Sequence, residues 1–168
     1  MAVTHVTAQY IFSRQREDST VALKNFVSMW NPVTSGKTIA FGGLFVSYMA
    51  TVASPSYPMR GYRITVQPTG GTLATSSEIC AFDNKVFMPA AEIRYGNPTI
   101  SGVDGAFFNS PPCLIQGQNT TGVIERIEPP PGFNPFLVRP GEGIVMRQDQ
   151  GAAGHFWNFS IAWTELNG

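Results

Sequence analysis

Histidine, the residue type that most often binds metals or exchanges protons in proteins, occurs only twice in this chain of 168 residues. The two are His5 and His155, and neither belongs to a His-x-His pair. Sites for iron, manganese or zinc commonly combine two or three histidines with a carboxylate. We therefore expect no metal site and no cofactor.

Cys80 and Cys113 have neither Cys-x-x-Cys spacing nor the spacing of zinc ligands. The first 18 residues lack the basic and then apolar layout of a secretory signal. A chain made in the cytosol keeps its thiols reduced, and one of this length needs no disulfide to fold. We expect both cysteines to be free and buried.

The segment TSGKT (34–38) resembles the end of a phosphate-binding P-loop. That loop needs a glycine at position 31, where this chain has Asn31, and a helix after Thr38, where β-type sequence follows. No Gly-x-Ser-x-Gly elbow is present, and neither histidine lies in a triad context. Paired carboxylates for glycoside hydrolysis remain open, because their spacing is spatial. We expect no catalysis.

The three tryptophans suggest a platform for carbohydrate. Trp157 and Trp163 alternate in register with Phe159 and Ile161, which favours a place in the core. Trp30 comes just before Asn31-Pro32 and remains the one tryptophan that could be an exposed binding residue.

Composition limits the partners. Eleven Lys and Arg balance eleven Asp and Glu, so the formal net charge is zero, and only 13% of the residues are charged. A neutral chain has no long-range attraction for nucleic acid or anionic lipid. The longest apolar run, 39–53, is shorter than the roughly 20 residues that a membrane helix needs. We expect neither nucleic acid nor membrane as a partner.

Alternation of apolar and polar residues with period two recurs along the chain, and no window predicts a helix. Glycine and proline turn signals separate these runs. The pattern predicts an all-β fold, an antiparallel β-sandwich of the jelly-roll kind. Strands are expected near 7–13, 20–30, 37–52, 59–67, 86–94, 113–117, 122–128, 136–148 and 155–165.

Two glycine-containing sites predict backbone features. Pro140 and Gly141 fit the second and third positions of a type II turn, which would join 136–139 and 143–148 in a hairpin. The pair Gly42-Gly43, inside a β-like run, predicts a bulge or a close backbone approach.

The first 20 residues differ from the rest because the segment RQRED (14–18) is strongly charged. It could be a solvated turn between two strands, or part of an arm that reaches a neighbouring subunit. We expect residues 1–20 to be an N-terminal arm or first strand, and residues 21–168 to be a single β-sandwich domain. In the arm interpretation, Arg14 and Arg16 contact the neighbour.

Two stretches are almost without charge. No charged residue lies between Thr38 and Met59, and Asp104 is the only one between Tyr95 and Val123. Edge strands usually carry lysine or glutamate, and an exposed aromatic surface is an aggregation liability in a monomer. The pattern therefore predicts burial against identical subunits in closed symmetry, with a trimer preferred. The aromatic residues of these stretches include Phe41, Phe45, Tyr48, Tyr57, Phe107 and Phe108, and the candidate interface residues are Arg14, Arg16, Trp30, Phe107 and Phe108.

Three sets of segments resemble small structural proteins of tailed bacteriophages. They are 25–47 (NFVSMWNPVTSGKTIAFGGLFVS), 62–83 with 91–102, and 137–148 (LVRPGEGIVMRQ) with 157–165. The resemblance covers most of residues 20–168. It implies a jelly-roll capsid decoration (cement) protein, or a related minor virion component. Such proteins are typically oligomeric, often trimeric, and sit on a shell of major capsid protein, so the resemblance implies location in the virion.

A second function class stays open. A lectin-like or receptor-binding jelly roll of a virion would bind carbohydrate, and exposed aromatic residues on a shallow groove would favour it. An enzyme is the third and weakest alternative.

Overall fold

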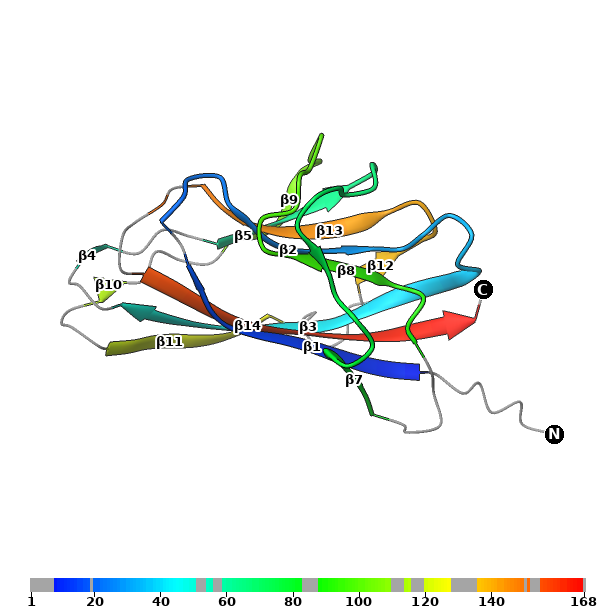
Figure 1. Cartoon of the computed structure of the whole chain (residues 1–168), viewed down its shortest axis with the longest axis horizontal. Helices are drawn as coiled ribbons and strands as arrows, with labels where there is room; N and C mark the ends of the chain where they lie inside the picture. The colour runs from blue at the N-terminus through cyan, green and yellow to red at the C-terminus, as the bar shows by residue number, and fades with distance from the viewer. Residues whose placement is uncertain are drawn as a thin grey trace.

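The structure is a computed structural model that describes residues 8–18, 20–50, 54–55, 59–82, 88–109, 114–115, 120–127, 136–149, 151 and 155–167. These residues form two antiparallel sheets packed face to face, as Figure 1 shows. The expected all-β sandwich is confirmed. The described segments contain no helix with the length and hydrophobicity that a membrane crossing requires.

Sheet A contains the longest strands. Its order is β11 (Thr120–Ile127), β3 (Lys37–Ala50), β14 (His155–Asn167), β1 (Ala8–Asp18) and β7 (Ile79–Ala81), and β12 (Phe136–Val138) also pairs with β3. Sheet B has the order β6 (Thr72–Leu73), β8 (Glu92–Tyr95), β2 (Asn25–Trp30), β13 (Gly143–Gln148), β5 (Met59–Ile64) and β9 (Ala106–Asn109). A separate short pair consists of β4 (Ser54–Pro55) and β10 (Leu114–Ile115).

The pairing is nested along the chain. In sheet A the first strand, β1, pairs with the last, β14, and β3 pairs with β11. In sheet B, β2 pairs with β13 and β5 pairs with β9. The chain is therefore equivalent to one long hairpin whose successive strand pairs alternate between the two layers.

The core lies between the sheets and is rich in aromatic residues. Trp157, Phe159, Ile161 and Trp163 all point inward from β14 and are at most 3% exposed, which confirms the expected place of the two tryptophans. Tyr10 of β1 stacks on Trp163 with ring centroids 5.4 Å apart. Period-two alternation therefore assigns the inner face of this strand correctly.

The expected bulge at Gly42-Gly43 is confirmed. Ala162 of β14 pairs with Gly43, whereas Trp163 pairs with Phe41, so Gly42 is the extra residue. A β-carbon at Gly42 would lie 3.3 Å from the Ala162 carbonyl oxygen. This close approach explains why glycine fits the bulge.

The predicted hairpin over 136–148 is wrong, although its turn is present. Glu142 N–H donates to the Arg139 carbonyl (3.0 Å), and Gly141 has φ +83°. The flanking strands enter different sheets, because β12 pairs with β3 whereas β13 pairs with β2 and β5. A type II turn does not match the twist of a two-stranded ribbon, so it splays the strands.

The N-terminal segment is a strand in the interior of sheet A. β1 lies between β14 and β7, and it includes the charged residues 14–18. Its pairing with β14 shifts between Arg14 and Glu17, where Arg16 has φ +55°. Residues 8–18 are therefore the first strand of the sandwich, and not an arm or a turn between strands. Residues 1–7 of the expected arm lie outside the described residues.

Candidate binding surface

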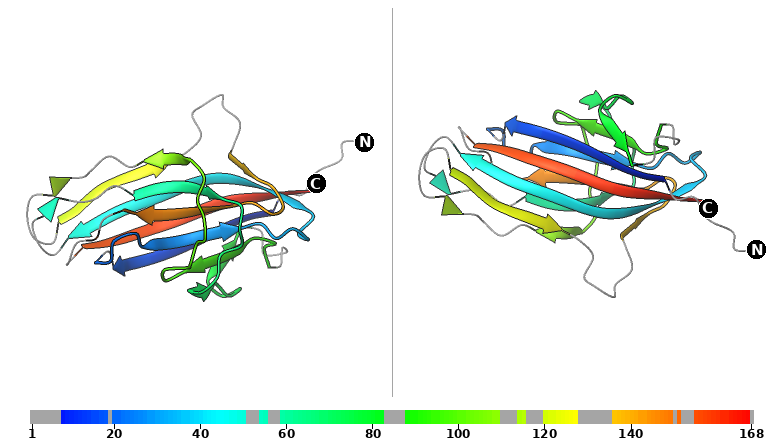
Figure 2. Two further views of the ribbon diagram at one scale, coloured as in Figure 1. Left: turned by 90° about the horizontal axis from the view of Figure 1, so that it is seen from above. Right: turned by 90° about the horizontal axis from the view of Figure 1, so that it is seen from below.

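The outer face of sheet B is covered by its own chain. Residues 97–105, between β8 and β9, cross this face, as the left panel of Figure 2 shows. Ile100 of this segment packs against a buried cluster of Trp30, Ile64 and Val145. The Asp104 N–H donates to the Arg63 carbonyl (2.9 Å) at the far side of the crossing. The middle of this face, around Trp30, Ile64 and Val145, is therefore covered.

The outer face of sheet A is not crossed by any segment that the structure describes, and its strands lie side by side in the right panel of Figure 2. Its described side chains alternate with the core residues of β1, β3 and β14. Most of these outward side chains are uncharged: Gln9, Ile11, Ser13, Thr38, Ala40, Phe45, Ser47, Phe156, Asn158, Ser160, Ala162, Thr164 and Leu166. The charged residues among those described are at the end of β1, where the Arg16 guanidinium lies over the Phe156 ring and Asp18 pairs with Phe156.

Short polar side chains are tied together across the middle of this face. The Ser13 and Ser160 hydroxyls lie 2.7 Å apart and share a hydrogen bond. Asn158 Nδ2 donates to the Ser47 hydroxyl (3.0 Å), and its Oδ1 accepts from the Arg16 N–H (2.8 Å). These bonds fix the side chains of three adjacent strands, so the face presents a pre-organised polar surface.

Two shallow depressions flank Phe45 on this face. The first, of about 260 Å³, is lined by Ser13, Gln15, Ser47, Asn158 and Ser160 beside the Phe45 ring. The second, of about 190 Å³, is lined by Gln9, Gly42, Phe82, Ala162 and Thr164, again with Phe45. Both offer hydroxyl and amide groups next to aromatic carbon. The residues that the structure describes include no cluster of histidine, cysteine or carboxylates that could hold a metal ion.

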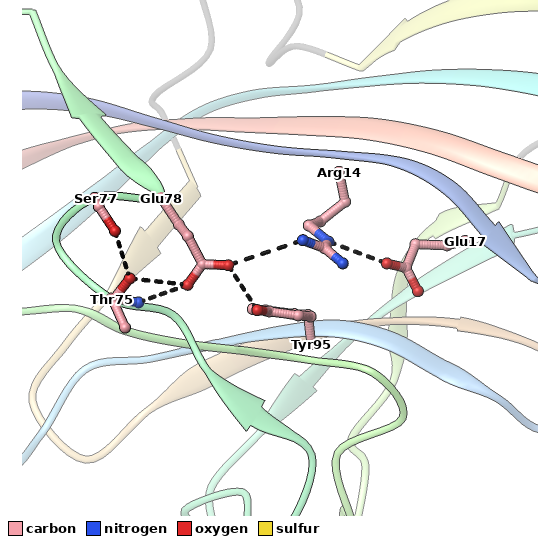
Figure 3. A network of polar contacts seen from close by, with 6 residues as sticks. All are labelled: Arg14, Glu17, Thr75, Ser77, Glu78 and Tyr95. Carbon is pink, nitrogen blue, oxygen red and sulfur yellow. Dashed lines mark hydrogen bonds and ion pairs between the residues drawn. The ribbon is translucent and has the colours of Figure 1, made fainter.

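A network of polar contacts joins the two sheets at the β1 edge (Figure 3). The Arg14 guanidinium contacts the carboxylates of Glu17 (3.1 Å) and Glu78 (3.8 Å), and it lies 4.3 Å from the centroid of the Tyr95 ring. The Tyr95 hydroxyl donates to Glu78 (2.6 Å). Because Arg14 is on β1 and Tyr95 is on β8, these contacts link sheet A to sheet B.

This network shifts the acid–base behaviour of two groups. The backbone N–H of Thr75, and then the Tyr95 hydroxyl, hold the pKa of Glu78 below its usual range by hydrogen bonding to the carboxylate. The same bond to Glu78 raises the pKa of Tyr95. Glu78 is therefore a charged acceptor that holds the 75–78 segment at the edge of the sandwich.

A buried carboxylate closes the opposite end of the core. Glu165 is 6% exposed, and its Oε1 accepts the Ala91 N–H (3.0 Å), which links β14 to the start of β8. Burial, and to a smaller extent the charge of Glu165, raises the pKa of Tyr10 to about 12. These groups are structural, since they face the core.

The five candidate interface residues do not form one site. Arg14 belongs to the network described above, and Trp30 is 5% exposed under Ile100, so it is not an exposed carbohydrate platform. Phe107 packs on Phe136, with centroids 4.5 Å apart. Arg16 is exposed, and its guanidinium lies 5.1 Å from the centroid of the Phe156 ring. The side chain of Phe108 lies outside the described residues.

Sequence reasoning also misjudged which residues are exposed. Cys80 is free, as expected, but it is exposed at the sheet edge, while Cys113 lies outside the described residues. Phe41 was expected on the surface and is 2% exposed. The large exposed apolar residues were not foreseen, and they include Val21, Leu23 and Phe82, at 53%, 60% and 64% exposure. Among these, only Phe82 belongs to a run whose alternation could have placed it.

Comparison with known proteins gives no relative for this chain: no family model, no curated protein and no solved structure matches it.

Proposed function

We propose that this chain is a structural virion protein that binds and stabilises the outer surface of a phage capsid shell. Its partner is the major capsid protein, and its role is adhesion without catalysis. The nested strand order supports the finer assignment of the sandwich as a jelly roll, an architecture of viral capsid proteins and lectins.

The observation that carries the proposal is the difference between the two outer faces. Residues 97–105 cross sheet B, whereas the described part of sheet A presents a bare face whose charges are confined to Arg16 and Asp18 at the end of β1. β14 has 13 residues, so at about 3.3 Å per residue it is about 43 Å long, and four strands spaced about 4.8 Å apart span about 19 Å. The face therefore offers about 800 Å², which is what each partner contributes to a stable interface.

Self-association is the second part of the proposal. A face of this size with so few charges is an aggregation liability for a monomer, and closed symmetry covers it with a finite number of copies. We propose a homo-oligomer, with a trimer preferred, in which part of the face is covered by a neighbour and the remainder contacts the shell.

Co-sedimentation with capsid shells assembled without this protein tests the shell contact. Ser160→Arg places a charge in the first depression, on an exposed hydrogen bond that contributes little to stability. Thr65→Arg is the matched control, since Thr65 is exposed at the end of β5 in sheet B. We expect Ser160→Arg to lose binding and Thr65→Arg to keep it. Equal binding of both variants would contradict this role of sheet A.

One observation favours carbohydrate binding as the alternative. The Phe45 ring lies between two depressions that carry hydroxyl and amide groups, and such groups beside an aromatic ring suit a sugar. A glycan array decides between the functions. Binding that is lost in Phe45→Ala, together with no binding to shells, would assign the chain to the lectin-like class.

A further inference from the structure

The loop between β1 and β2 presents two aliphatic side chains to solvent. Val21 is 53% exposed and Leu23 is 60% exposed. The loop lies at the end of the sandwich opposite to the two chain termini (Figure 1). It is therefore a projecting apolar feature, unlike the polar residues that usually occupy such a loop.

Hydrogen bonds to the end of β13 hold this loop in one shape. Gln148 Nε2 donates to the Val21 carbonyl (2.9 Å), and the Gln148 N–H donates to the Lys24 carbonyl (3.1 Å). The Leu23 N–H donates to the Asp149 carbonyl (3.4 Å). Because the backbone is fixed, little freedom remains to be lost when the loop binds a partner.

The backbone of Leu23 makes its side chain unexpected. Leu23 has φ +55°, a left-handed conformation that favours glycine or asparagine and is strained for other residues. Inside its own chain the exposed leucine side chain contributes little burial to compensate for this strain. The strain and the exposure together indicate that the side chain acts in a contact outside the chain.

The second depression of sheet A is a suitable receptor for these side chains. Its walls include the rings of Phe45 and Phe82, and the Phe82 N–H is fixed by a bond to the Gln9 carbonyl (2.9 Å). The depression is open, has a volume of about 190 Å³, and carries the polar Gln9 and Thr164 at its rim beside this apolar surface. Neither Val21 and Leu23 nor the residues that line this depression are charged, so the contact would not desolvate an ionic group of its own.

One chain cannot make this contact with itself. Gln9 lies near the start of β1, whereas the loop follows the end of β1 at Asp18, about 30 Å away along the strand. A second copy must therefore supply the loop. Since loop and depression are different surfaces, the contact is head-to-tail, the type that closes into rings such as trimers.

We propose that Val21 and Leu23 of one copy insert into the depression formed by Gly42, Phe45, Phe82 and Ala162 of the next copy. The inference rests on the proposed homo-oligomer and names its interface. The first depression and its polar side chains then remain available to the shell.

Light scattering on the full chain at 20 µM tests the contact. Leu23→Gly removes the side chain and relieves the strained backbone, so we expect an equal or higher melting temperature together with loss of the oligomer. Ala162→Trp should fill the depression and give the same loss. A hot-spot contact corresponds to an affinity change of at least about 30-fold. Val33→Ser is the control. Val33 is 73% exposed but belongs neither to this loop nor to the depression, so removal of its apolar side chain should leave the oligomer intact.

Mixing the two variants shows the direction of the contact. At 200 µM, Leu23→Gly supplies an intact depression and Ala162→Trp supplies an intact loop, so we expect a 1:1 heterodimer that neither variant forms alone. An oligomer that persists in both variants, or a mixture without heterodimer, would overturn this interface and leave the proposed function standing. A monomeric wild type would overturn the homo-oligomer itself.

Discussion

Asn31 joins the two sheets where the chain crosses between them, and Asn31→Ala should destabilise the fold. The side chain is fully buried, and its Nδ2 donates to the carbonyls of Lys37 (2.8 Å) and Val138 (3.0 Å) in sheet A. Its backbone N–H donates to the Glu142 carbonyl (2.9 Å), and its carbonyl accepts from the Gly141 N–H (2.8 Å). The substitution removes only the two side-chain hydrogen bonds. The two backbone hydrogen bonds of residue 31 are present in both the wild type and the variant.

The magnitude follows from the groups left without a partner. The Val138 carbonyl belongs to a fully buried residue, so loss of its bond to Asn31 should cost about 1–3 kcal/mol. The Lys37 carbonyl is partly buried and keeps a bond from the Ser35 hydroxyl (3.4 Å), so its loss of the Asn31 bond should cost at most about 1 kcal/mol. The Asn31 Oδ1 is buried without a partner, so its removal returns a part of this. We expect a net loss of about 1–3 kcal/mol, or a melting temperature lower by roughly 2–12 °C.

Urea unfolding followed by tryptophan fluorescence measures this loss, and Ser28→Ala is the matched control. The Ser28 hydroxyl is also buried, but it has no partner, so its removal should leave stability equal or slightly higher. A loss below about 1 kcal/mol for Asn31→Ala, or an equal loss for Ser28→Ala, would show that the hydrogen bonds of Asn31 do not stabilise the fold as expected.

Three further substitutions or measurements test the packing. Gly143→Ala places a β-carbon 2.6 Å from the Met29 carbonyl oxygen and should cost about 1–3 kcal/mol in urea unfolding, whereas Gly102→Ala, with no atom within 4 Å, should be neutral. The pKa of Tyr10 is raised to about 12 in the folded state, so the stability that Tyr10 contributes is complete below pH 10 and is lost as the pH rises toward 12. In Tyr10→Phe, the urea concentration at the midpoint of unfolding should therefore fall less steeply between pH 10 and 12. Deletion of residues 2–18 removes β1 from sheet A and should abolish the cooperative transition seen by circular dichroism.

The strands whose alternation is uninterrupted could be predicted from the sequence. β14 shows period two over most of its length, because one of its faces packs on a single core. The type II turn at Pro140-Gly141 was also predictable, since it depends on local backbone preferences. Its consequence was not, because the partner of β12 is β3, about 100 residues earlier in the chain.

The bulge at Gly42 determines which side chains of β3 lie on the candidate surface. The sequence indicated this bulge, but the expected orientation of the residues after it did not take the bulge into account. Ile39 and Phe41 point inward before Gly42, and Leu44 and Val46 point inward after it, so the alternation inverts at the bulge. Phe45 is placed on the outer face for this reason, although it has the same parity as Phe41. The exposed Leu23 could not have been found, since its left-handed backbone is imposed by bonds to the distant β13.

The few charges of this chain are used within the sandwich, and this determines how its free face can bind. Arg14 pairs with Glu17 and Glu78, Arg60 with Asp149 (2.6 Å), and Arg63 with Glu142 (3.4 Å). All these pairs are partly exposed, so each contributes little to stability, but together they neutralise the edges beside a face whose described charges are confined to Arg16 and Asp18. Attachment through sheet A should therefore depend on shape and apolar contact, with little effect of ionic strength. We expect co-sedimentation with shells to change less than about threefold between 50 and 500 mM salt, and a steep fall would instead place the contact on charged residues outside this face.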